Sequence, residues 1–131
     1  MFSKILLTLS ILIYALVVPI LEINPTHVFN LEWPPHARLH EVWQLLTNST
    51  IGLFCLWLTW CKQEVRLPSM LTFMITGGFL VAYVIRGSYG GSMVLSDGSE
   101  KTLLGINLGV FGFCLAIALA ALAMRLQHTP K

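Results

Sequence analysis

The sequence contains long apolar stretches with almost no charged side chains. The clearest of these cover Ile5–Ile23, Pro68–Ile85 and Leu103–Met124. Each is close to the roughly 20 residues that a helix needs to cross the hydrocarbon core of a membrane. The sequence therefore predicts an all-α fold built from membrane-spanning helices.

Composition excludes several classes of protein. Of the 131 residues, 56% are hydrophobic and only 11% are charged, whereas a soluble domain carries about a quarter charged residues. So few charges cannot cover a globular surface, which excludes a soluble enzyme, a nucleic-acid-binding protein and a disordered linker. The net charge of +2 is too small to indicate an anionic macromolecular partner. The lipid bilayer is the expected environment.

A fourth stretch mixes polar and apolar residues. Only Ile51–Trp60 is strongly apolar, and polar side chains precede it from Gln44 to Thr50. The pair Pro34-Pro35 suits a helix start, because the first turn of a helix does not need the amide proton that proline lacks. We expect one long helix from about residue 35. The sequence then predicts a single membrane domain, residues 1–131, with spans at 5–23, 42–60, 68–85 and 103–124, folded as an integral membrane four-helix up-down bundle.

The distribution of lysine and arginine predicts an orientation. With four spans, both termini and the second loop share one side of the membrane. The basic residues on that side are Lys4, Lys62, Arg66, Arg125 and Lys131, and those on the opposite side are Arg38, Arg86 and Lys101. Because cytoplasmic loops carry the excess of basic residues, we expect both termini in the cytoplasm and the histidine-rich first loop on the opposite side.

Glycines mark a possible close contact between helices. Gly105, Gly109 and Gly112 are predicted to share a face of the fourth span, and small residues let helix backbones approach closely in lipid. Gly77-Gly78 in the third span is a candidate for the facing surface. The pattern fits packing within the bundle, and a dimer face is the alternative.

Three of the four histidines lie between Asn24 and Asn48, together with Glu32, Arg38 and Glu41. Steps of four residues from His36 reach His40, Gln44 and Asn48, and residues four apart lie on one face of a helix. A polar stripe exposed to lipid is costly. We therefore expect this stripe to face the bundle interior or a wet cavity.

The histidine spacing suits a metal site. Two histidines at i and i+4 on a helix, here His36 and His40, can bind one metal ion. His27 is the candidate third ligand, and Glu22 or Glu32 is a candidate oxygen donor. Three nitrogen ligands with an open position suit zinc, iron or copper. Such an ion would activate water or oxygen toward a lipophilic substrate.

Other interpretations remain open. His36 or His40 is a candidate base without metal, with Glu41 or Glu22 as its partner. The supporting polar residues in either enzyme are Asn30, Gln44 and Asn48. Alternatively, the histidines form a hydrogen-bonded network at the membrane interface. The chain would then be a non-catalytic accessory subunit of a larger membrane complex, and a homo-oligomer is a further alternative.

The same segment carries a motif of the form T-H-x-F-N followed by W-P-P-H-A-x-x-H. It consists of Thr26, His27, Phe29, Asn30, Trp33, Pro34, Pro35, His36, Ala37 and His40. This motif resembles a signature of small, uncharacterised four-span membrane proteins of bacteria and fungi. The resemblance covers only the first helical hairpin and implies no activity, but it indicates that the three histidines matter.

Overall fold

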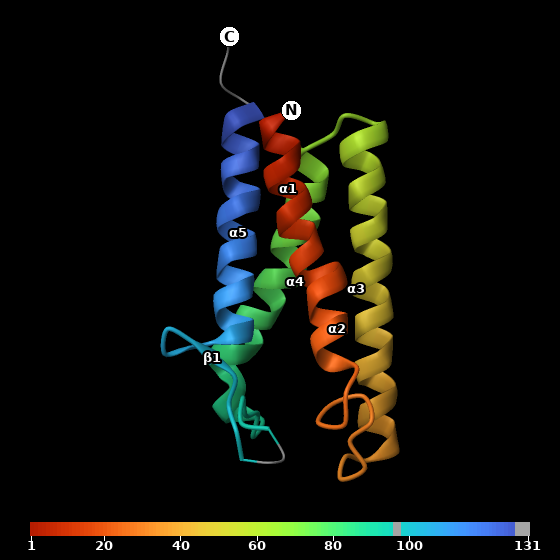
Figure 1. Cartoon of the computed structure of the whole chain (residues 1–131), viewed down its shortest axis with the longest axis vertical. Coiled ribbons are helices and arrows are strands. Elements are labelled where there is room, and N and C mark those ends of the chain that lie inside the picture. Colours follow the sequence, from red (N-terminus) through yellow and green to blue (C-terminus); the bar gives the residue numbers. More distant parts are fainter. Residues whose placement is uncertain (96–97, 128–131) are drawn as a thin grey trace.

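The computed structural model describes residues 1–95 and 98–127 and is mostly helical, as the sequence predicts. His128 and Lys131, in the tail beyond the fourth apolar stretch, lie outside the described residues. The helical segments are α1 (Phe2–Leu12), η1 (Ile13–Val17), α2 (Val18–Glu22), α3 (Pro35–Cys61), α4 (Arg66–Ile85), η2 (Arg86–Ser88) and α5 (Leu108–Gln127). The long helices lie side by side and alternate in direction (Figure 1). We call the end that carries residues 23–34 the histidine end.

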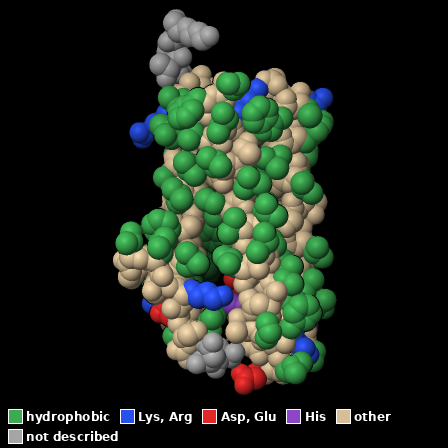
Figure 2. All heavy atoms as spheres, viewed as in Figure 1, with side chains coloured by type: hydrophobic (Ala, Val, Ile, Leu, Met, Phe, Trp, Pro, Cys, Tyr) green, Lys and Arg blue, Asp and Glu red, His purple; other side chains and the backbone are tan. Residues whose placement is uncertain are grey.

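Within residues 1–95 and 98–127, three helices are long and apolar enough to cross a membrane: Phe2–Glu22, Arg66–Ser88 and Leu108–Gln127. Figure 2 shows hydrophobic side chains over most of the height of the molecule and charged side chains gathered toward its two ends. The helix α3 begins at Pro35, where the Pro34-Pro35 pair predicts a helix start. Although α3 has 27 residues, it is less apolar than the other long helices.

The first apolar segment is a continuous helix with an irregular middle. Pro19 has no amide proton, so the carbonyl of Ala15 loses its usual partner four residues later. The segment η1 is a π turn, in which the Val18 amide donates to the Ile13 carbonyl. The hydroxyl of Ser49 in α3 donates to the Ala15 carbonyl at 2.9 Å. A side chain from another helix thus supplies the hydrogen bond that Pro19 removes.

Gly52 lets α3 approach this irregular turn closely. A Cβ atom at Gly52 would lie 2.2 Å from the Cβ of Ala15 and 3.4 Å from Cγ2 of Ile11. Ile11 and Tyr14 belong to the hydrophobic core, together with Cys55 of α3 and Phe113 of α5. The contact between Gly52 and Ala15 therefore fixes α3 against the first helix beside the core.

The close face of α5 is formed mainly by alanines, and of the predicted glycines only Gly109 makes a tight contact, since a Cβ there would lie 3.2 Å from Cζ of Phe79 in α4. Ala116, Ala120 and Ala123 are fully buried, and the Ser10 hydroxyl of α1 donates to the Ala116 carbonyl at 2.6 Å. A Cβ atom at Gly112 would make only an ordinary contact, and Gly77 and Gly78 have open space around them. The prediction that Gly77-Gly78 supplies the facing surface was wrong.

Gly105 lies outside the last helix, because the first residues of the fourth apolar stretch are not helical. Strands β1 (Thr102–Leu103) and β2 (Ile106–Asn107) form a two-stranded antiparallel hairpin, and α5 begins at Leu108 rather than near residue 103. Leu104 and Gly105 form the hairpin turn with φ of 54° and 78°, the left-handed values that two-residue hairpin turns need. Asn107 then caps α5, since its Oδ1 accepts the Gly109 amide at 2.9 Å.

The contact at Gly52 makes a prediction about stability. We expect Gly52→Ala to destabilise the protein by about 1–3 kcal/mol, because an added methyl group in a packed contact forces the helices apart. Gly78→Ala is the matched control and should be neutral or stabilising, since a methyl group there meets open space. Thermal unfolding in detergent measures both. Equal unfolding temperatures for the two variants would contradict the close contact, and Ala15→Gly should rescue Gly52→Ala.

Candidate functional site

The strongest polar contact at the histidine end joins Glu22 and His27. Oε2 of Glu22, the last residue of α2, lies 2.8 Å from Nε2 of His27 in the following loop. The side chains retain only 26% and 19% of their exposure, respectively. The edge of the His27 ring also meets Trp33, at 5.7 Å between ring centroids. The pair is therefore half-buried, with part of its surface open.

Backbone hydrogen bonds fix the loop that carries His27. The amides of Asn24 and Val28 both donate to the Glu22 carbonyl, at 2.9 and 3.2 Å. Asn30 is only 2% exposed, and its side chain donates to the Thr26 carbonyl at 3.1 Å and accepts the Glu32 amide at 2.9 Å. The structure thus places Asn30, a predicted supporting residue, where it holds the His27 loop in shape.

A chain of hydrogen bonds continues from the other ring nitrogen of His27. Nδ1 of His27 lies 2.9 Å from Oγ1 of Thr26, and that hydroxyl lies 2.6 Å from Oδ1 of Asn24. The Asn24 oxygen also accepts the Thr26 amide at 2.7 Å, so it is an acceptor. Rotating the Thr26 hydroxyl lets it donate to Asn24 while accepting from His27, or donate to His27. Both neutral tautomers of His27 therefore find partners.

Charged side chains surround this pair. Glu41 of α3 and Lys101, from the connection between α4 and α5, both interact electrostatically with Glu22. Burial lowers the pKa of His27 below its ordinary value, and the positive charge of Lys101 lowers it further. Burial also raises the pKa of Glu41. His27 is therefore a neutral imidazole at neutral pH, beside a carboxyl group.

The surface near this end is hollowed. Figure 2 shows basic, acidic and histidine side chains meeting at one point low on the drawn face, just below a hollow between the helices. One basic, one acidic and one histidine residue near this end interact with one another: Lys101, Glu22 and His27. Polar groups that meet at a hollow are the arrangement expected of a binding site.

The other two predicted histidines form a separate pair. Nε2 of His36 and Nε2 of His40 lie 3.0 Å apart, with ring centroids 4.4 Å apart, and both side chains are exposed at the start of α3. The pair does not include His27, which contacts Glu22 and Thr26. Among residues 1–95 and 98–127, no group of three His, Cys, Asp or Glu side chains is placed to hold a metal ion.

The polar stripe on α3 does not face inward as predicted. His36, His40 and Gln44 are exposed, Asn48 is half-buried, and only Gly52 one turn further is buried. Glu41 is half-buried and interacts with Glu22, so the neighbouring face of α3 points toward the first helix. The expected inward orientation was wrong for the outer part of the stripe, because the contacts of Ser49 and Gly52 set the rotation of α3.

Comparisons with protein-family models, with curated proteins and with solved structures find no match. The chemistry of the site therefore rests on its geometry. Sequence reasoning named Glu22 and Glu41 as partners of histidines, but it missed Lys101. No local pattern marks Lys101, since only the fold brings the connection before α5 next to the end of α2.

The lowered pKa of His27 predicts a pH-dependent stability. Its folded pKa lies below the ordinary 6.5, so the unfolded chain binds more protons between those two values. Stability that is present above about pH 6.5 should therefore be lost as the pH falls toward the folded pKa. The carboxyl groups of Glu22 and Glu41 titrate beside His27, so this loss is measured as the difference in unfolding temperature between the wild type and His27→Gln in detergent from pH 7.5 to 5.

Variants separate His27 from other titrating groups. The unfolding temperature of the wild type relative to His27→Gln should fall as the pH falls, whereas His36→Gln, at an exposed position, should keep the wild-type profile. Lys101→Gln should make the loss smaller, because it removes a like charge near the imidazolium and so brings the folded pKa of His27 closer to 6.5. A His27→Gln profile identical to wild type would contradict the assignment.

Proposed function

We propose that this chain is an integral membrane enzyme that moves a proton on a lipophilic substrate, with Glu22 as the catalytic base and His27 as its positioning residue. The observation that carries the proposal is the 2.8 Å contact between Oε2 of Glu22 and Nε2 of His27 at the end of an apolar helix. A half-buried carboxyl–imidazole pair is suited to general acid–base catalysis.

The proposed topology is a four-helix up-down bundle with four spans. The alternating helix directions support it, as does the length of α3, whose 27 residues exceed the thickness of the hydrocarbon core. The W-P-P-H-A-x-x-H motif and its resemblance to four-span proteins agree with this topology. The excess of lysine and arginine at the N-terminal end supports cytoplasmic termini, with the histidine end on the opposite side.

The proposed chemistry uses the free oxygen of Glu22. Among the described residues, Oε1 of Glu22 has no hydrogen-bond partner, while Oε2 is held by His27. Oε1 takes a proton from a carbon next to a carbonyl or a double bond, the double bond shifts, and the carboxyl group returns the proton to another carbon. One C–H bond breaks and one forms, so the product is an isomer of the substrate.

The hydrogen bonds from His27 to Thr26 and from Thr26 to Asn24 return the Glu22–His27 pair to its starting protonation state after each reaction cycle. His27 can accept a proton from Glu22 at Nε2 while Nδ1 donates to Thr26, whose hydroxyl turns to Asn24. The carboxyl group thereby exchanges protons without depending on the substrate. The position of Glu22 at the last turn of an apolar segment supports a substrate delivered from the lipid phase.

Deuterium incorporation tests this proposal without knowledge of the substrate. The protein is incubated in nanodiscs with a total membrane lipid extract in deuterium oxide, and lipids are examined by mass spectrometry for deuterium bound to carbon. We expect the wild type to label a lipophilic compound. Glu22→Gln should reduce the rate by about 10²–10⁴-fold, the usual contribution of a general acid–base group.

His27 and Glu32 serve as the comparison variants. His27→Gln should lower the rate and shift its pH profile, as expected of a group that sets the protonation of Glu22. Glu32→Gln changes an exposed carboxylate in the same loop and should keep the wild-type rate. Absence of labelling by the wild type, or equal labelling by Glu22→Gln, would overturn the proposal.

Metal analysis addresses the alternative chemistry at His36 and His40. We expect well below one zinc, iron or copper ion per purified chain, because metal enzymes use three or more protein ligands and this exposed pair supplies two. Elemental analysis compares the wild type with the His36→Ala/His40→Ala double variant. Near-stoichiometric metal in the wild type that is lost in the double variant would favour a metal-dependent enzyme instead.

The second candidate function is an accessory subunit of a larger membrane complex. It is favoured by α3, which exposes polar Gln44 and Thr47 beside large apolar side chains, a surface better suited to protein than to lipid. Extraction in a mild detergent distinguishes the two functions. A stable stoichiometric complex with a larger membrane protein would favour the subunit, whereas a lone chain or a homo-oligomer favours the enzyme.

A further inference from the structure

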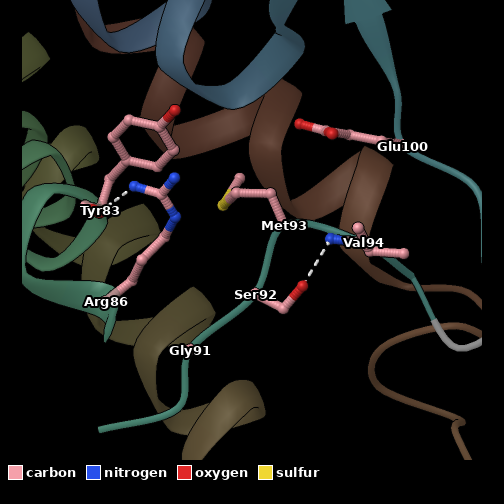
Figure 3. Close-up of a pocket in the computed structure, with 7 residues that line it drawn as sticks. All are labelled: Tyr83, Arg86, Gly91, Ser92, Met93, Val94 and Glu100. Atoms are coloured by element: carbon pink, nitrogen blue, oxygen red, sulfur yellow. Dashed lines mark hydrogen bonds between the residues drawn. The ribbon is translucent and has the colours of Figure 1, made fainter. Parts of the chain in front are cut away.

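A separate polar pocket of about 260 Å³ opens where α4 ends, also at the histidine end. Its walls include Tyr83 from the last turn of α4, Arg86 from η2, and Met93 and Glu100 from the connection to α5. Figure 3 shows the guanidinium of Arg86 and the carboxylate of Glu100 entering the pocket from two sides, with Met93 between them. None of these residues belongs to the Glu22–His27 pair.

The positive group of the pocket is held in place. A guanidinium nitrogen of Arg86 donates to the Tyr83 carbonyl at 2.8 Å, and the guanidinium carbon lies 4.1 Å from the centre of the Tyr83 ring. This stacking fixes the plane of the guanidinium. One of its five N–H donors is used by the carbonyl. The others are suited to a phosphate, which an arginine fork binds through two parallel hydrogen bonds.

The negative group is tied to the start of α5. Oε1 of Glu100 accepts the side-chain amide of Asn107 at 3.0 Å, and Asn107 in turn caps α5. In the described part of the chain, the second oxygen of Glu100 has no hydrogen-bond partner and Glu100 forms no ion pair with Arg86. The pocket thus presents one positive and one negative group that do not neutralise each other.

We propose that this pocket binds the head group of a phospholipid of the phosphatidylethanolamine class, with the phosphate on Arg86 and the primary ammonium on Glu100. Opposite charges in one pocket match a zwitterion. The volume is below the range of pockets for drug-sized ligands, which suits a head group. The pocket adjoins a helix long and apolar enough to span a membrane, so its ligand lies at the membrane surface.

The same geometry disfavours a choline head group. A quaternary ammonium has no N–H donors for a carboxylate and is bound by open aromatic faces. Tyr83 is the aromatic residue of this pocket, and its ring already faces Arg86. A primary ammonium instead donates charge-assisted hydrogen bonds to Glu100. The pocket therefore prefers ethanolamine to choline.

Native mass spectrometry of the detergent-purified protein tests the proposal. Phosphatidylethanolamine, phosphatidylcholine and phosphatidylglycerol with the same acyl chains are titrated separately, together with free phosphoethanolamine. We expect the wild type to bind phosphatidylethanolamine at least on the order of tenfold more tightly than phosphatidylcholine, the difference made by a charged hydrogen bond. Equal binding of the two lipids would overturn the head-group assignment.

Variants test whether Arg86 binds the phosphate and Glu100 binds the ammonium group of the lipid. Arg86→Gln should weaken phosphatidylethanolamine binding about tenfold, and Arg86→Lys should weaken it less, because it keeps the charge but loses the planar fork. Glu100→Gln retains an acceptor for Asn107 but should abolish the preference for phosphatidylethanolamine over phosphatidylcholine, because it removes the negative charge that binds the primary ammonium. The matched controls are Arg66→Gln, at the opposite end of α4, and Glu32→Gln, both at exposed positions.

Two further results would contradict the proposal. Wild-type lipid preference in both Arg86→Gln and Glu100→Gln would show that the lipid binds elsewhere. If free phosphoethanolamine binds as tightly as the lipid, the ligand is not specifically a membrane lipid, since the acyl chains contribute nothing to binding. This result would overturn the proposal of a lipid ligand. Circular dichroism of each variant checks that the helices are intact before binding is compared.

Discussion

The structure depends on one contact between helices, the approach of α3 to the irregular turn around Ala15. Ser49 satisfies the carbonyl that Pro19 leaves without a partner, and Gly52 removes the side chain that would keep the backbones apart. Satisfying a backbone group matters most in lipid, where water cannot replace the missing donor. The same contact sets the rotation of α3 and turns Glu41 toward Glu22. Packing in the middle of the helices thus determines which charges meet at their end.

Much of the fold could be predicted from the sequence, because the length and hydrophobicity of a stretch determine whether it becomes a long helix. The rotation of α3 could not, since it depends on small residues on one helix meeting an irregular turn on another. The hairpin before α5 was also missed, because its apolar side chains continue the hydrophobic stretch and its turn depends on the left-handed backbone at Leu104 and Gly105.

The candidate site was only partly predictable. A spacing of four residues indicates that His36 and His40 lie together, and they do. Nothing in the sequence showed that His27 would bind Glu22 instead of joining them, because the loop between α2 and α3 takes its shape from hydrogen bonds of Asn24 and Asn30. Lys101 is supplied by a connection distant in the chain. Local periodicity predicts contacts within a helix, whereas a site assembled from a helix end and two loops depends on the tertiary fold.

The π turn η1 has a consequence for how the chain can change over evolution. A π turn contains more residues than an α turn, and each residue rotates the rest of a helix by about 100°. Deleting one residue between Ile13 and Val17 would therefore be absorbed when the π turn becomes an α turn, and Glu22 would stay on its side of the helix. Deleting one residue from α2, which has no such turn, would rotate Glu22 by about 100° relative to the helices that pack against η1. Descendants that keep Glu22 beside His27 can therefore lose a residue from this turn but not from α2.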